Sequence, residues 1–162
     1  TMGKPMGNGI PISGLAAKED VLAAFSDKLP YFNPFGGNPV SIAAAQAVLK
    51  YIKDENLQEH CKKAGAALLK ALKERHPESV GDVRGAGLFL GFEFVKNDGN
   101  KTPDKDMALN VIEMLRDEHI LTSVIGHYGN ILKLRPPMVF SENDIDWFAT
   151  SLDKCITKLE NK

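Results

Sequence analysis

Residues 80–95 read VGDVRGAGLFLGFEFV, and this stretch decides the fold class. From residue 88 to residue 95, every second residue is a large apolar one, and the residues between them include Gly91 and Glu93. The apolar positions are Leu88, Leu90, Phe92 and Phe94. A period of two is typical of a strand with one buried face. Residues 80–84 are the expected hairpin partner of that strand. The pattern therefore predicts a β-hairpin in the middle of the chain.

Two helical patterns precede the hairpin. The first begins after Asn38, a good N-cap, with Pro39 at the first helical position, where its missing N–H costs nothing. The second covers residues 57–72, with apolar residues at spacings of three and four, and His76-Pro77 is expected to end it. Cys61 lies within this apolar stripe, so we interpret it as a core residue and not as a reactive thiol.

The elements after the hairpin complete the predicted fold. Thr102 and Pro103 are expected to cap and begin a helix, and two short strands are predicted at residues 120–125 and 131–135. A last helix follows, with a capping box that begins at Ser141. This order favours an α+β two-layer sandwich, in which a small antiparallel or mixed sheet carries its helices on one face.

The first part of the chain has a more irregular composition. Residues 1–14 are rich in glycine and proline, which predicts a loop that enters a short strand at Ile10–Ser13. A short helix is predicted over Glu19–Phe25. Residues 29–41 are again dense in glycine, proline and asparagine, so we expect an irregular connection there.

The composition of the 162-residue chain excludes several classes of protein. Its 20 Lys+Arg residues against 21 Asp+Glu residues argue against a dedicated nucleic-acid binder. No run of about 18 apolar residues is present, so no membrane-spanning segment is expected. The 2 cysteines both fall in helical patterns, which favours a reducing compartment such as the cytoplasm. The histidines and cysteines lack ligand spacing, so no metal site is expected.

Four places in the sequence could carry chemistry: Lys4, the FGGNP stretch, Arg135 and Arg84. Lys4 lies in an uncharged, glycine-rich loop, where partial desolvation of its amine would favour Schiff-base chemistry, although a lysine there could equally be solvated. The FGGNP stretch, residues 35–39, brings backbone N–H groups to a helix start that could face an anion, or forms only a tight turn. Arg135 could bind a carboxylate or phosphate, or form a surface salt bridge, and Arg84 has the same ambiguity.

Four segments together resemble a known family. They are TMGKPMGNGIP (1–11), YFNPFGGNPVSIAAAQAVL (31–49), VRGAGLFLGFEFV (83–95) and GNILKLRPPMVFS (129–141). In this order and with these separations they resemble the C-terminal part of class III pyridoxal-phosphate-dependent aminotransferases, which have the fold-type I architecture. The first two segments look closest to the alanine–glyoxylate-aminotransferase-2-like branch, which includes phospho-lyases acting on ethanolamine phosphate and phosphohydroxylysine.

The resemblance implies roles for particular residues. Lys4 matches the lysine that forms a Schiff base with pyridoxal 5′-phosphate and then shuttles the α-proton of the substrate. Phe35, Gly36 and Gly37 match the segment that reaches the cofactor phosphate of the neighbouring subunit in a homodimer. Arg135 matches a position that holds a substrate carboxylate in several family members.

Two further positions match the family in a different way: at one the family's usual residue is missing, and at the other its role is structural. Pro34 stands where family members usually carry Thr, so the resemblance implies that one hydroxyl contact to the cofactor phosphate is missing here. Arg84 matches the arginine of a conserved turn of the family, which we interpret as structural.

The resemblance also implies a domain organisation and a reaction. Residues 1–38 would be the tail of the large cofactor-binding domain, 39–53 a connecting helix and 54–162 the small C-terminal domain. The chain opens with Thr1, and we expect it to be the C-terminal part of a longer enzyme and inactive alone. The expected reaction transfers an amino group between an amino acid and an oxo acid. The alternatives are elimination of phosphate from a phosphorylated amine and a non-catalytic module that mediates dimerisation.

Overall fold

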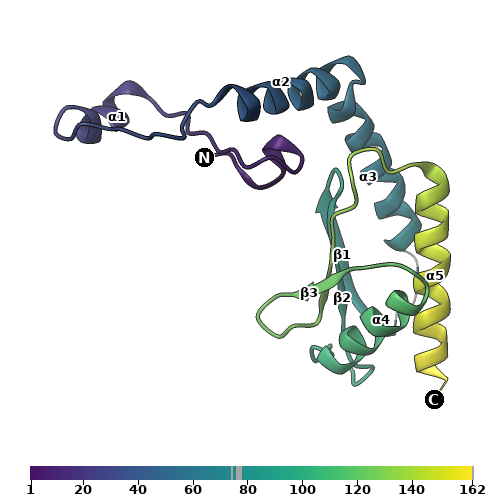
Figure 1. Ribbon diagram of the computed structural model, residues 1–162. Helices are drawn as coiled ribbons and strands as arrows, with labels where there is room; N and C mark the ends of the chain where they lie inside the picture. Colours follow the sequence, from purple (N-terminus) through teal and green to yellow (C-terminus); the bar gives the residue numbers. More distant parts are fainter. Residues whose placement is uncertain (74, 76–77, 162) are drawn as a thin grey trace. The chain divides into compact units, whose positions relative to one another are not determined.

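The structure is a computed structural model that describes residues 1–73, 75 and 78–161 (Figure 1). It divides into two compact units, Thr1–Asn56 and Leu57–Lys162, which are described separately here. His76-Pro77, the predicted end of a helix, lies outside the described residues.

The second unit is built on a four-stranded antiparallel sheet. Its strand order is β1 (Val80–Ala86), β2 (Phe89–Phe94), β4 (Ile131–Leu134) and β3 (Ser123–Ile125). The predicted hairpin is therefore β1 and β2, and β4 joins the sheet next to β2.

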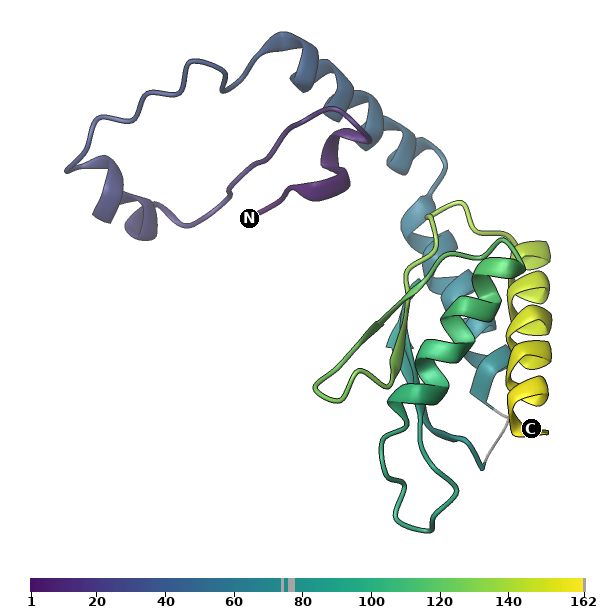
Figure 2. The same ribbon diagram turned by 60° about the horizontal axis from the view of Figure 1, so that its bottom comes forward.

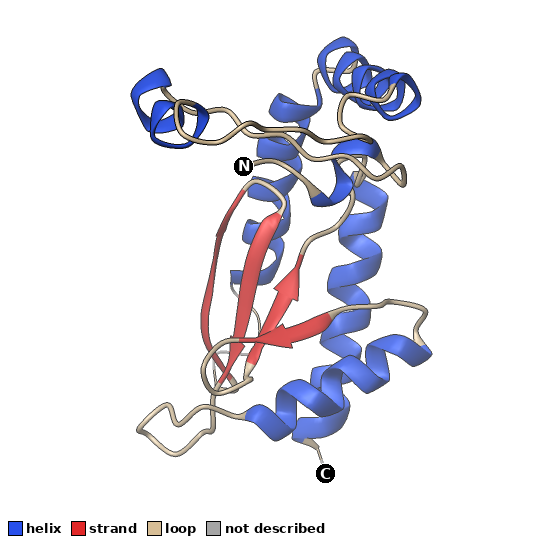
Figure 3. Cartoon of the chain, turned by 60° about the vertical axis from the view of Figure 1, so that its left-hand side comes forward, coloured by secondary structure: helices blue, strands red, loops and turns tan. Residues whose placement is uncertain are grey.

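Three helices cover one face of this sheet, as Figures 2 and 3 show. Helix α3 (Leu57–Lys73) contacts β1 and β2, whereas α4 (Lys105–Asp117) contacts β2, β3 and β4. Helix α5 (Glu142–Glu160) packs against both of these helices. The predicted α+β arrangement of a small sheet with helices on one face is confirmed.

The core lies between this sheet and its helices. The alternation along β2 buries Leu90, Phe92 and Phe94, while Glu93 lies on the opposite face. Helix α3 approaches the hairpin so closely that a Cβ atom built on Gly65 would lie 2.0 Å from the carbonyl oxygen of Gly87. Residues that bury almost all of their side chains complete the core: Leu68, Leu72, Val111, Leu115, Leu132, Leu152, Cys155 and Ile156.

The first unit contains a 3₁₀ turn, η1 (Lys4–Gly7), and two helices, α1 (Glu19–Ser26) and α2 (Pro39–Asp54). The predicted cap is confirmed, because the Asn38 side-chain oxygen accepts a hydrogen bond from the Ser41 N–H at 2.9 Å. Turn η1 contacts α2. Only Gly7 and Ser41 are buried within this unit, and among the apolar residues of α2, Val40, Ile42 and Leu49 are exposed.

Several local predictions were wrong for identifiable reasons. No strand forms at Ile10–Ser13; instead Met2 and Gly14 form an isolated bridge, with their N–H groups donating to each other's carbonyl oxygens at 2.7 and 2.9 Å. The third strand starts at Ser123 and not at residue 120, because the Ile120 N–H bonds back to the end of α4. Cys61 is half-buried and therefore does not belong to the core.

The helix predicted at Thr102-Pro103 starts two residues later. The carbonyl oxygen of Thr102 accepts a hydrogen bond from the Lys96 N–H at 2.8 Å, and Pro103 bridges to Val95, so both residues extend the sheet region. Asp104 is the N-cap instead, and its carboxylate accepts from the Met107 N–H at 2.9 Å. By contrast, the capping box predicted for α5 is present.

None of the helices in the described residues is long and apolar enough to cross a membrane.

Candidate functional site

Lys4 occupies the first position of η1 and is exposed. Its φ of 52° lies in the left-handed region, which side chains other than glycine rarely adopt. The bridge between Met2 and Gly14 fixes the chain just before it, and η1 itself contacts α2. Unusual backbone conformations of this kind cluster at functional sites because the surrounding structure must hold them.

The Phe35–Gly37 segment is a turn organised by Asn33. The carboxamide oxygen of Asn33 accepts hydrogen bonds from the Phe35 N–H at 3.2 Å and from the Gly36 N–H at 3.0 Å. A Cβ atom on Gly36 would lie 2.8 Å from the Asn33 side-chain nitrogen, and Gly37 has a φ of 70°. Both glycines are therefore needed for this conformation.

The turn leaves one of its N–H groups available. Within the described part of the chain, nothing accepts a hydrogen bond from the Gly37 N–H. The Phe35 side chain is 84% exposed. The segment is thus a tight turn that still offers one donor and one aromatic ring to another molecule.

The structure brings this turn close to the start of the chain. An open depression of about 540 Å³ is lined by Met2 and Gly14 on one side and by Asn33, Gly36 and Gly37 on the other. Lys4 does not line it. Lys4 and the turn therefore do not share this depression.

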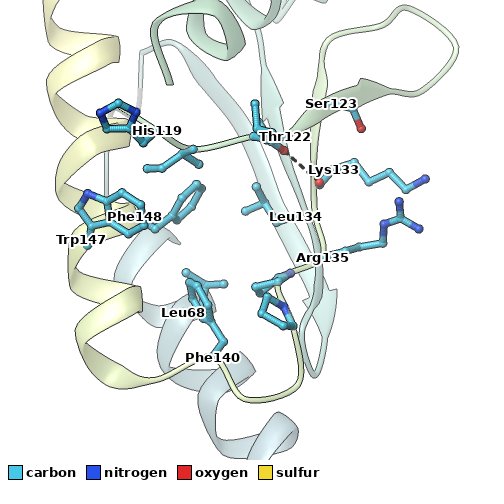
Figure 4. A pocket seen from close by; sticks show the side chains of 14 residues that line it. Leu68, His119, Thr122, Ser123, Lys133, Leu134, Arg135, Phe140, Trp147 and Phe148 are labelled. Atoms are coloured by element: carbon cyan, nitrogen blue, oxygen red, sulfur yellow. Dashed lines mark hydrogen bonds between the residues drawn. The ribbon is translucent and has the colours of Figure 1, made fainter. Parts of the chain in front are cut away.

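Arg135 follows the last residue of β4 and precedes Pro136-Pro137. Beside it lies a cavity of about 480 Å³, into which Leu134, Phe140 and Phe148 point (Figure 4). Lys133 and Arg135 are also among the residues that line this cavity, although Figure 4 shows their charged ends extending away from Leu134 and the other apolar side chains. The charged ends of Lys133 and Arg135 therefore lie apart from the apolar side chains of the cavity.

Neither of these cations has a charged partner in the described residues. Arg135 is exposed and Lys133 is half-buried, and neither forms an ion pair there. The Lys133 backbone is held by a hydrogen bond from the Thr122 hydroxyl to its carbonyl oxygen at 3.1 Å. The alternative in which Arg135 forms a surface salt bridge does not describe this structure.

Arg84 behaves differently. Its Nη1 atom lies 2.8 Å from the Asp82 carboxylate and 2.6 Å from the Glu93 carboxylate. The hydrogen bond to Glu93 raises the pKa of Arg84 most, and the hydrogen bond to Asp82 raises it further. Because Arg84 connects β1 to β2 in this way, its contacts are those of a structural residue.

Two residues near these positions were missed by the sequence interpretation. Asn33 gave no signal beyond its place in a glycine- and proline-rich stretch. Lys133 did give one, since it lies two residues before Arg135 in a predicted strand and so shares its face.

The remaining titratable groups do not suggest another centre. The described residues contain no group of three His, Cys, Asp or Glu side chains that could hold a metal ion. Burial raises the pKa of the Cys61 thiol, which lies 3.7 Å from the Met138 carbonyl oxygen, and the same effect raises the pKa of the buried Cys155. Raised thiol pKa values disfavour nucleophilic chemistry at neutral pH.

Comparison with known proteins agrees with the sequence motifs. Residues 1–156 match the family model for class-III aminotransferases. The chain is 44% identical over 161 residues to ethanolamine-phosphate phospho-lyase homolog 1 of Caenorhabditis elegans, covering 97% of this chain and 34% of that protein. It is 40% identical to an alanine–glyoxylate aminotransferase 2-like protein of Drosophila melanogaster, covering 95% of this chain and 32% of that protein.

A solved structure is also similar. It is a phospholyase from Arthrobacter in complex with phosphoethanolamine, with 36% sequence identity and a TM-score of 0.90 over 96% of this chain and 37% of that chain. The chain thus spans about a third of the length of the proteins that it matches. It belongs to the class III aminotransferase family.

Proposed function

We propose that this chain supplies the C-terminal part of a pyridoxal-phosphate-dependent enzyme that transfers an amino group between an amino acid and an oxo acid. Residues 1–38 would end the large cofactor-binding domain, 39–53 would connect, and 54–162 would form the small domain. The observation that carries the proposal is the exposed amine of Lys4 on a left-handed, glycine-flanked turn, within a chain matched to the family from its first residue.

The residues present fit the cofactor. Its aldehyde needs a primary amine, and Lys4 has no ion-pair partner among the described residues. Its phosphate needs N–H donors, and the Gly37 N–H is available while Asn33 occupies those of Phe35 and Gly36. Phe35 and Gly36 would then shape the turn, and Gly37 would donate to the phosphate. When bound, pyridoxal phosphate acts as an electron sink for carbanion chemistry.

Each of these residues has a definite task in this proposal. The Nζ atom of Lys4 would hold the cofactor through its aldehyde and, when free, would remove and return the proton of the amine-bearing carbon. Arg135 orients the substrate through paired hydrogen bonds to an anionic group. The Phe35–Gly37 turn would serve the cofactor of the partner subunit in a homodimer, as the family resemblance implies.

The surface of the first unit supports an assembled state. Apolar residues that are at least half exposed are numerous on this unit: Met2, Leu15, Val21, Phe25, Leu29, Tyr31, Phe32, Phe35, Val40, Leu49 and Tyr51. Clusters of this kind mark contact surfaces. Two free cysteines agree with our placement of the enzyme in a reducing compartment, the cytoplasm.

Elimination of phosphate from a phosphorylated amine is the second candidate. Two of the similar proteins are named a phospho-lyase homolog and a phospholyase, the latter in complex with phosphoethanolamine. Both reactions begin with proton removal by the same lysine, so Lys4 serves either.

The test uses the protein that carries this chain, purified with pyridoxal phosphate. Borohydride reduction followed by peptide mass spectrometry should place the cofactor on Lys4. Lys4→Ala should abolish the visible absorbance of the bound cofactor, whereas Lys18→Ala, which removes another exposed lysine of the same unit, should not. A cofactor found on a different lysine would overturn the assignment.

Product analysis separates the two reactions. The enzyme is offered amino acids with oxo acids, and phosphorylated amines alone, while amino transfer and released phosphate are measured. Amino transfer supports the first candidate and phosphate release the second. Neither product, from protein with bound cofactor, would refute both.

A further inference from the structure

Lys133 lies on the face of β4 that is opposite to the helices, and Arg135 directly follows the end of this strand. Two residues along a strand are about 6.7 Å apart, so their long side chains can reach one anion together. Figure 4 shows both side chains extending from the strand to the same side. The neighbours of Lys133 across the sheet are Gly91 on β2 and Ser123 on β3, so no bulky or acidic group flanks it.

The acidic groups on this sheet face are already engaged. Glu93 lies on the same side of β2 as Gly91, but its carboxylate bonds to Arg84 at 2.6 Å and to the Asn130 side chain at 3.4 Å. Asp82 is bound to Arg84 as well. Arg84 is thus balanced by two carboxylates, whereas Lys133 and Arg135 have none among the described residues.

Two neighbouring cations without counter-ions repel each other unless an anion joins them. A single carboxylate carries one charge and is satisfied by one arginine through two parallel hydrogen bonds. A phosphomonoester carries about −1.5 to −2 at pH 7 and has three acceptor oxygens. Its charge and its number of acceptors match the arginine together with the lysine and the Ser123 hydroxyl.

We propose that Lys133 and Arg135 form a clamp for the dianionic phosphate of a phosphorylated amine substrate. Arg135 presents its planar fork to two oxygens, Lys133 adds a point charge, and Ser123 donates a hydrogen bond. Lys133 then selects between substrates, because a monocarboxylate needs only Arg135. This inference rests on the second candidate under the proposed function, elimination of phosphate from a phosphorylated amine, and on the role of Arg135 at the substrate.

The test measures ligand binding in the cofactor-loaded protein, without turnover. Inorganic phosphate and acetate are titrated at pH 7.5 into wild type, Lys133→Met, Lys133→Arg, Arg135→Met and the distant surface control Lys70→Met. Loss of one charged hydrogen bond should weaken phosphate binding about tenfold in Lys133→Met. Lys133→Arg should stay within about threefold of wild type, and Lys70→Met should bind like wild type.

Acetate and pH provide the discriminating readouts. Lys133→Met should change acetate affinity by less than about twofold, whereas Arg135→Met should weaken both anions. Lowering the pH to 5.5 converts phosphate to its monoanion and should reduce its affinity more in wild type than in Lys133→Met.

Three results would overturn the clamp. The first is an unchanged affinity of Lys133→Met for phosphate, and the second is an equal loss of affinity for phosphate and acetate in this variant. The third is a loss of affinity for pyridoxal phosphate, without a loss of affinity for the added anion. The last result would assign Lys133 to the cofactor and not to the substrate. Because Lys4 labelling tests the proposed function separately, failure of the clamp and failure of that function are distinguishable.

Discussion

Gly65→Ala tests how the small domain is held together. The added Cβ atom would lie 2.0 Å from the Gly87 carbonyl oxygen and 2.2 Å from its carbon, and both are backbone atoms that no rotamer change can move. Ordinary contact begins at 3.4 Å, so α3 and the β1–β2 hairpin must separate by roughly 1.4 Å. Overpacking costs about 1–3 kcal/mol, and this clash belongs at the upper end. Alanine returns about 1 kcal/mol of helix propensity, which leaves a net loss of about 2 kcal/mol.

The assay is thermal unfolding followed by circular dichroism, with urea unfolding as a second measurement. A loss of about 2 kcal/mol should lower Tm by about 10 °C. The matched control is Ala66→Gly, at the next position of α3, which is exposed and should cost only the propensity term of about 1 kcal/mol. If Gly65→Ala is as stable as wild type while Ala66→Gly is destabilised, the close approach of α3 to Gly87 is wrong.

Two further predictions concern the cofactor turn and acid stability. Pro34→Thr should tighten pyridoxal phosphate binding by about three- to tenfold, because the new hydroxyl adds one donor beside the turn, and an unchanged dissociation constant would show that Asn33 and Gly37 already suffice. Hydrogen bonds from the Ser141 N–H and hydroxyl lower the pKa of Asp144 below its ordinary value, so its stabilising contribution is present above the unfolded pKa and is lost as the pH falls through the folded pKa. Asp144→Asn should therefore melt below wild type at pH 7, and this difference should vanish as the pH falls well below about 4; a constant difference would contradict the capping argument.

Elements defined by local sequence were predicted well. The alternation along β2 reflects which side chains face the helices, and Asn38 and Ser141 bond to N–H groups only three residues away. These contacts need no information from distant parts of the chain. Lys4 and Arg135 were singled out from their immediate neighbours and from the family resemblance, and their roles stay predictions.

Features that depend on distant partners were not predicted. Thr102-Pro103 has the local pattern of a helix start. However, Thr102 accepts a hydrogen bond from Lys96 and Pro103 forms a bridge with Val95, so Asp104 is the N-cap. The absence of acidic neighbours around Lys133 depends on the register that sets Gly91 and Ser123 beside it. Register is a property of the assembled sheet and cannot be derived from a single strand.

The nearly coreless first unit has a consequence for amide hydrogen exchange. Helix α2 has 16 residues and a good cap, but an isolated helix of this length is only marginally stable in water. The backbone amides of α2 should therefore exchange fast while apolar residues such as Val40 and Leu49 are exposed to solvent. Their exchange should slow down once another surface covers these residues. Exchange along Pro39–Asp54 thus reports assembly directly, with the buried strand β2 as an internal reference that stays protected in either state.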